Sequence, residues 1–159
     1  MAAVVEARQS NGLTQRGFAE ASGLPLAFVW KTEIGERRVS ALDLIRIAWG
    51  SGYTPKSLVE RALDPAAPLV RMPADASTPA ITEKLLARMA ELLIKEIRSA
   101  RERRGWDQRR LSARIKRSSG FISKLETGRT RVDALDLFQI AKALDISVPE
   151  VVERVARIR

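Results

Sequence analysis

The chain has 159 residues, enough for one domain or two small ones, and its 45% of hydrophobic residues can form packed cores. It contains no cysteine and no histidine, which excludes disulfides, a thiolate nucleophile and Cys-ligated zinc and removes the commonest general base and metal ligand. The net charge of +9 favours a polyanionic partner, and no apolar run approaches the ~20 residues that span a membrane. We therefore expect a cytoplasmic protein without a membrane partner.

Short helices, without strand-like alternation, are expected along residues 1–62. Thr14, Ser40 and Thr54 stand where their side chains can cap three of these helices. Pro55 follows the last of these caps and suits a first helical position. The pattern predicts an all-α unit.

Residues 63–79 differ in composition from the rest of the chain. They contain four prolines and show neither a helical nor a strand period, so we expect an extended, semi-rigid linker. The linker divides the chain into an N-terminal domain, 1–62, and a C-terminal domain, 80–159.

The second half opens with a long amphipathic helix at 81–103, whose apolar stripe can pack on its own domain, on the first domain or on a second chain. Asp107, Ser118 and Asp133 are expected to cap the three helices that follow. Residues 147–150 then have the Ser-x-x-Glu pattern of a capping box and open a last helix.

The two halves are similar to each other. Residues 7–61 align with 100–154 without a gap, at an offset of 93, and 20 of the 55 pairs are identical. The heptapeptides RVSALDL, 38–44, and RVDALDL, 131–137, share six of seven residues. This internal match predicts a duplication, and we call residues 1–62 the first copy and 80–159 the second copy.

Each copy carries one compact motif, TQRGFAEASGLPLAFVWKTEIG at 14–35 and DQRRLSARIKRSSGFISKLETG at 107–128. In both, a glutamine opens one helix and a Glu–x–Gly pattern closes the next, preceded by Leu125 in the second copy and by Thr32 in the first. These segments resemble the helix-turn-helix domain of the lambda-repressor/Cro family, also called the xenobiotic-response-element (XRE) type. The resemblance implies two lambda-repressor-like five-helix domains joined by the Pro-rich linker, double-stranded DNA as partner, and no cofactor.

The same resemblance implies which residues touch DNA. In this family a glutamine bonds a phosphate, the N-terminal part of the third helix meets base edges in the major groove, and the following loop touches the backbone. In the first copy these positions are Gln15, Arg16, Leu26, Ala27, Lys31, Arg37 and Arg38. In the second copy they are Gln108, Arg109, Arg117, Ser118, Ser119, Gly120, Ser123, Lys124, Arg129 and Arg131.

Three positions depart from the family pattern. Lys116 stands where the first copy has Gly23, at a turn that often requires a positive φ. Leu26 cannot hydrogen-bond a base, although it can touch a thymine methyl. Trp30 stands where the second copy has Ser123, and it either packs differently, contacts the DNA backbone or belongs to a protein interface.

Two Arg–Glu pairs hold the same spacing, Arg8 with Glu33 and Arg101 with Glu126. In the family such a pair is a partly buried ion pair between the first and third helices. We expect a scaffold role for both glutamates, because a lone carboxylate without a second titratable group nearby is a poor catalytic site.

The positive charge is unevenly distributed. Residues 1–61 carry 8 Lys/Arg and 6 Asp/Glu, a net of +2, whereas 81–159 carry 19 and 11, a net of +8. Because phosphate neutralisation dominates affinity for DNA, the second copy should be the stronger DNA binder.

We interpret the chain as a sequence-specific DNA-binding transcription regulator and not as an enzyme. The favoured reading is a DNA-associated repressor of the phage or prokaryotic immunity or lysogeny type, which occupies an operator with both domains. The alternative is that the second copy binds DNA while the first copy mediates protein interaction or dimerisation, as in an antitoxin-like or partner-recruiting regulator. A homodimer through the 81–103 helix and a protein partner at the N-terminal domain both remain open.

Overall fold

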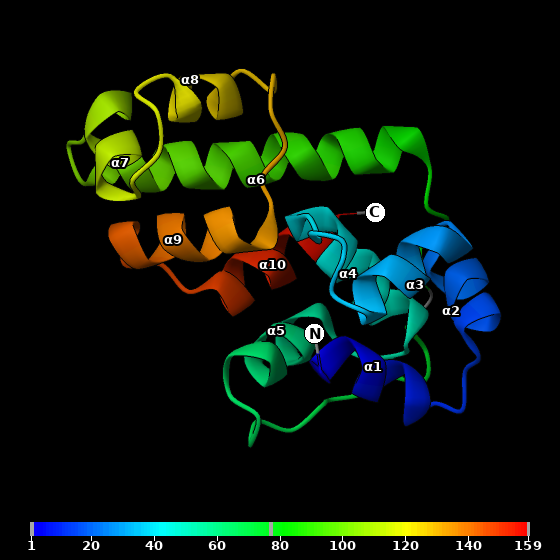
Figure 1. Cartoon of the computed structure of the whole chain (residues 1–159). Coiled ribbons are helices and arrows are strands. Elements are labelled where there is room, and N and C mark those ends of the chain that lie inside the picture. The colour runs from blue at the N-terminus through cyan, green and yellow to red at the C-terminus, as the bar shows by residue number, and fades with distance from the viewer. Residues whose placement is uncertain (1, 77, 159) are drawn as a thin grey trace.

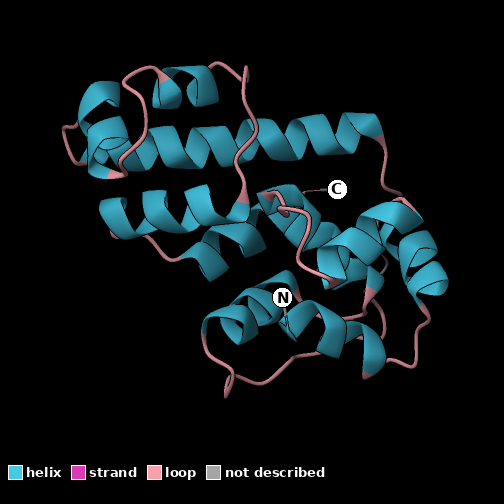
Figure 2. Ribbon diagram, in the orientation of Figure 1, coloured by secondary structure: helices cyan, strands magenta, loops and turns pink. Residues whose placement is uncertain are grey.

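The structure, a computed structural model, describes residues 2–76 and 78–158, and within these ranges it contains ten helices and no strand (Figure 2). The predicted all-α class is confirmed. The helices of the first copy are α1 Ala2–Gln9, α2 Gln15–Ser22, α3 Leu26–Glu33, α4 Ala41–Gly50 and α5 Pro55–Leu63. Those of the second copy are α6 Glu83–Arg103, α7 Gln108–Arg114, α8 Phe121–Glu126, α9 Ala134–Leu144 and α10 Val148–Ala156.

Helix starts follow the capping residues that the sequence predicted, with one exception. The side chains that cap are Thr14, Ser40, Thr54, Asp107, Asp133 and Ser147. The prediction for Ser118 was wrong: α8 starts after Gly120, which makes no side-chain cap bond. Ser118 contributes its backbone instead, because the Phe121 N–H donates to its carbonyl oxygen at 2.9 Å.

The two matching heptapeptides pair with each other. Ser40 and Asp133, which are equivalent positions, form an isolated antiparallel bridge. The Ala41 N–H donates to the Val132 oxygen at 3.1 Å, and the Ala134 N–H donates to the Val39 oxygen at 2.8 Å. Each bond is the counterpart of the other at the offset of 93, so the copies meet here with a local two-fold relationship. We call this contact the seam.

Equivalent helices continue this relationship away from the seam, since α5 packs on α10 and α4 packs on α9. One buried hydrophobic cluster runs through both copies, and it includes Ile45 and Val59 of the first copy with Val151 and Val152 of the second. At the edge of this contact the Lys56 ammonium lies 2.5 Å from a Glu150 carboxylate oxygen. The first copy keeps a second, smaller core of its own, around residues such as Phe18, Phe28 and Leu58.

The long helix α6 joins the copies a second time (Figure 1). Its C-terminal half packs against α8, α9 and α10, and its N-terminal half reaches α4. Leu85 and Met89 of that half are 7% and 0% exposed and belong to the cluster that both copies share. The apolar stripe of α6 is therefore covered within the chain, on its own copy and on the first copy.

Residues 64–76 after α5 form no helix, turn at 65–66 and again at 74–75, and are held to the first copy. The Thr54 N–H donates to the Val70 oxygen at 2.8 Å and the Met72 N–H to the Gly52 oxygen at 3.0 Å. The Arg71 guanidinium donates to the Asn11 side-chain oxygen at 2.5 Å. The segment is thus a strap along the first copy rather than a free spacer. No helix of residues 2–76 and 78–158 has the length and hydropathy to cross a membrane.

Candidate nucleic-acid interface

The α7–turn–α8 unit has the tight turn that the sequence suggested. Lys116 adopts φ 55°, in the left-handed region that its equivalent Gly23 occupies at φ 61°. Such a conformation is unfavourable for a residue with a side chain, and the surrounding bonds hold it in place. The Arg117 N–H donates to the Ser112 oxygen at 2.9 Å, and the Lys116 N–H donates to the Ala113 oxygen at 3.0 Å.

Ser112 fixes α8 relative to α7, and the sequence analysis did not single it out. The residue is fully buried; its hydroxyl donates to the Ser119 oxygen at 3.4 Å and accepts from the Ile122 N–H at 3.3 Å. A serine at an inward-facing position of an amphipathic helix was the available signal, because a buried hydroxyl needs a partner. The first copy has Ala19 at the equivalent position and so lacks this link.

Glu126 is the hub that joins α6, α7 and α8. The Arg101 Nε and Nη2 atoms donate to its two carboxylate oxygens at 2.7 and 3.0 Å, and the Gln108 amide donates at 2.7 Å. Arg98 approaches the same carboxylate at 3.5 Å. The first copy repeats the arrangement with Glu33, which accepts from Arg8 at 2.5 and 3.0 Å and from Gln15 at 2.8 Å. The predicted ion pairs are confirmed, and both glutamines lie beside them.

Both glutamates are held ionised. Burial opposes ionisation of Glu126, but hydrogen bonds from Arg101 and Gln108 and the charges of Arg101 and Arg98 outweigh it, so the pKa of Glu126 lies below its ordinary value. For Glu33, burial is likewise outweighed by the bonds from Arg8 and Gln15, and its pKa is also lowered. A carboxylate that is charged and fully bonded has a structural role.

Arg117 is paired with α9, although 37% of its side chain stays exposed. Its Nε and Nη2 atoms lie 2.8 and 2.5 Å from the buried Asp136 carboxylate, and its guanidinium lies over the Phe121 ring, 5.4 Å from the centroid. It therefore braces the turn against α9. The sequence placed Arg117 among the DNA contacts, and this stays a prediction; charge alone did not reveal its partner Asp136.

The other positions around α8 form an open polar surface. Ser118, Ser119 and Lys124 are exposed, while Gly120 and Ser123 are half-buried. The exposed cations Arg109, Lys124, Arg129 and Arg131 make no ion pair within the described residues. Further cations gather from α7, the turn and α9, where Arg110, Arg114, Lys116 and Lys142 line one hollow of about 720 Å³. Lys142 was not predicted, because its place beside α7 depends on tertiary packing.

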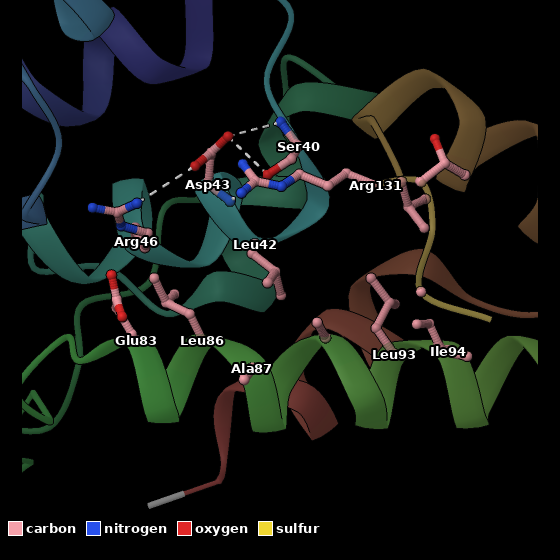
Figure 3. A pocket seen from close by; sticks show the side chains of 14 residues that line it. Ser40, Leu42, Asp43, Arg46, Glu83, Leu86, Ala87, Leu93, Ile94 and Arg131 are labelled. Atoms are coloured by element: carbon pink, nitrogen blue, oxygen red, sulfur yellow. Dashed lines mark hydrogen bonds and ion pairs between the residues drawn. The ribbon is translucent and has the colours of Figure 1, made fainter. Parts of the chain in front are cut away.

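Two equivalent arginines of the predicted sites lie at the seam. Arg38 reaches from the first copy to the Asp133 carboxylate at 3.1 Å. Its counterpart Arg131 points across the seam toward Ser40 and Asp43, at the edge of a hollow of about 510 Å³ between α4, α6 and the α8–α9 loop (Figure 3). The Asp43 carboxylate already pairs with Arg46 and accepts from Ser40, and Arg131 makes no ion pair within the described residues.

The equivalent face of the first copy is different in kind. Leu26, Trp30 and Ile34 are 43%, 47% and 49% exposed, and the second copy has Ser119, Ser123 and Thr127 at these positions. Of the other first-copy positions, Arg16, Ala27, Lys31 and Arg37 are also exposed. Arg37 lies over the Phe28 ring, 4.5 Å from the centroid. The two copies thus present one polar and one apolar version of the same surface.

Residues 97–151 match the family model described as Helix-turn-helix. Neither a curated protein nor a solved structure matches the chain significantly. The matched segment runs from the C-terminal part of α6 into α10 and contains the Glu126 hub, the braced turn and α8. Over residues 97–151 the second copy is therefore similar to one helix-turn-helix domain of the XRE type.

Proposed function

We propose that the protein is a transcriptional repressor that occupies an operator by placing α8 of the second copy in the major groove. The observation that carries the proposal is the surface around α8, where polar side chains that can meet base edges are surrounded by cations without ion-pair partners. The remaining cations suit phosphates on either side of the groove. Ser112, Glu126 and Arg117 support the proposal because they hold this surface rigid from beneath.

Two arrangements can perform this function. In one, both copies contact the operator, and the chain reads two unlike half-sites. In the other, only the second copy contacts DNA. The exposed Leu26, Trp30 and Ile34 favour the second arrangement, because three large apolar side chains on one helix face offer no hydrogen bond to a base. Positive charge supports the same division, at +2 for residues 1–61 against +8 for 81–159.

Selection of bound duplexes from a random DNA pool by the full chain tests the proposal. We expect one enriched motif, a specific affinity that exceeds binding to scrambled DNA by roughly 10³-fold or more, and a steep fall in affinity as salt rises. Footprinting on the enriched site then counts the half-sites that the chain covers. Binding that is equal for all sequences would contradict the proposed operator recognition.

A further inference from the structure

The exposed face of α3 is unlike a solvated helix face. Its large side chains, Leu26, Trp30 and Ile34, recur every four residues and form one continuous stripe. The opposite side of the helix is already packed, since Phe28 and Val29 are 6% and 2% exposed. These three side chains are therefore not part of the core of the first copy, and grouped on one side of α3 they form a candidate interaction site.

The other apolar helix faces are covered to a greater degree. The α5 and α10 faces cover each other, and Leu85, Met89 and Ile97 of α6 are buried, while Leu86 and Ile94 of α6 are half-buried at the hollow between α4, α6 and the α8–α9 loop. The remaining large hydrophobic residues that are exposed in the described ranges, Leu63, Val70 and Leu135, do not form such a stripe. Within the described residues, α3 is therefore the helix whose exposed large hydrophobic side chains gather on one face.

We propose that this stripe binds the same stripe of a second molecule of the protein, with the two α3 helices antiparallel. The register follows from the spacing, which is symmetric about Trp30. A two-fold axis beside Trp30 places Leu26 of one molecule opposite Ile34 of the other and brings the two indole rings together. An isologous contact requires such self-complementarity, and aromatic side chains at its centre supply much of the contact area.

The charges at the two ends of α3 fit the same register. The helix begins after Pro25, which gives it no side-chain cap, and Leu26 and Ala27 of its first turn are exposed, so a carboxylate from outside can approach the positive end of the helix dipole. Glu36 lies two residues beyond Ile34, is exposed, and makes no ion pair within the described residues. In the antiparallel pair, Glu36 of each molecule stands at the N-terminal end of the other α3, where a carboxylate is favourable.

The association itself does not depend on the proposed DNA binding, but its consequence rests on it. A two-fold dimer through α3 carries one α8 helix from each molecule, so it should read an operator with two inverted half-sites. The dimer also accounts for a difference between the two halves of the chain. The first copy has Leu26, Trp30 and Ile34 where the second copy has Ser119, Ser123 and Thr127.

Sedimentation equilibrium of the full chain without DNA tests the proposal. The decisive variant carries Leu26→Ser, Trp30→Ser and Ile34→Thr together, which installs the residues of the second copy at positions that are solvent-exposed. Leu135→Ser, at an exposed leucine outside the stripe, is the matched control. We expect the wild type and Leu135→Ser to dimerise below ~0.1 mM and the triple variant to remain monomeric with unchanged circular dichroism.

The dependence on salt concentration distinguishes dimerisation through α3 from DNA binding. Two molecules of net charge +9 repel each other, so screening should strengthen the dimer, whereas it weakens binding to DNA. A wild type that stays monomeric at ~0.1 mM at high salt, or a triple variant that dimerises as strongly as the wild type, overturns the proposal. Protection of Trp30 by operator DNA in a monomeric complex also overturns it and identifies DNA as the occupant of α3.

The triple variant also separates this proposal from the proposed function. It should still bind a single half-site with wild-type affinity and lose affinity for the two-half-site operator. A wild type that dimerises but selects no DNA would retain the dimer and overturn operator binding.

Discussion

Arg101 and Glu126 form a two-point ion pair with side chains only 9% and 1% exposed. The Arg101→Ala substitution should lower the free energy of unfolding by ~3–5 kcal/mol, because it leaves a buried carboxylate without its main partner. Chemical denaturation measures the change. Arg129→Ala, at an exposed arginine without an ion pair, is the control and should change stability by less than ~0.5 kcal/mol. Similar effects of the two substitutions would show that the hub is not structural.

The two hub glutamates make stability depend on pH in a defined direction. Both Glu33 and Glu126 have pKa values lowered in the folded protein, because the bonds from Arg8 and Gln15, and from Arg101 and Gln108, outweigh the effect of burial. Their contribution is therefore present above the unfolded pKa, about 4.3, and is lost as pH falls through the folded values. We expect the free energy of unfolding to decline below about pH 4.3.

Glu126→Gln provides the comparison. This variant should be less stable near neutral pH and should show a shallower decline in acid, because one of the two responsible carboxylates has been removed. Denaturant titrations at a series of pH values would record both slopes. Parallel slopes for the variant and the wild type would mean that other carboxylates control acid stability.

Thr32 carries the one buried side-chain hydroxyl in the described residues that lacks a hydrogen-bond partner. It is 1% exposed and stands where the second copy has Leu125. Thr32→Val removes the unpaired hydroxyl and should raise the free energy of unfolding by about 1 kcal/mol, or the melting temperature by about 2–4 °C. Thr127→Val, at an exposed threonine whose hydroxyl is bonded, should bring no gain. A destabilised Thr32→Val would show that the hydroxyl is satisfied in solution.

The shared core should make the two copies unfold together. Val59 lies in the first copy, is 1% exposed, and belongs to the cluster that continues into α10. Val59→Ala should therefore shift the unfolding of both copies by the same amount, about 1–3 kcal/mol. Single-tryptophan variants that retain Trp49 or Trp106 report on the first and second copy separately. Coincident curves are expected, and two separate transitions would mean that the copies are independent.

Local features of the fold could be predicted from the sequence because they depend on residues close in the chain. Caps such as Asp107 and the left-handed turn at Lys116 are of this kind. The pairing of Arg101 with Glu126 was expected from the family resemblance, which carries tertiary information. The contact between the two copies could not be predicted, because periodicity indicates that Val59 faces inward but not that α10 covers it.

The same limit applies to the candidate site. Arg38 and Arg117 have the charge of a phosphate contact, and only the folded chain brings Asp133 and Asp136 to them. Leu26 was assigned to the DNA contacts by its position in the motif. Only the folded chain exposes Trp30 and Ile34 together with it on one side of α3.

The central claim, that the second copy reads the operator and the first does not, is tested most directly by one pair of substitutions. Lys124 and Lys31 are equivalent positions, and both are exposed. Fluorescence anisotropy on the selected operator, at one fixed salt concentration, measures the affinity of Lys124→Ala and Lys31→Ala. The account predicts a loss of ~1–3 kcal/mol for Lys124→Ala, about 5- to 150-fold in Kd, and an unchanged Kd for Lys31→Ala. Equal losses for the two variants, or a loss for Lys31→Ala alone, would contradict it.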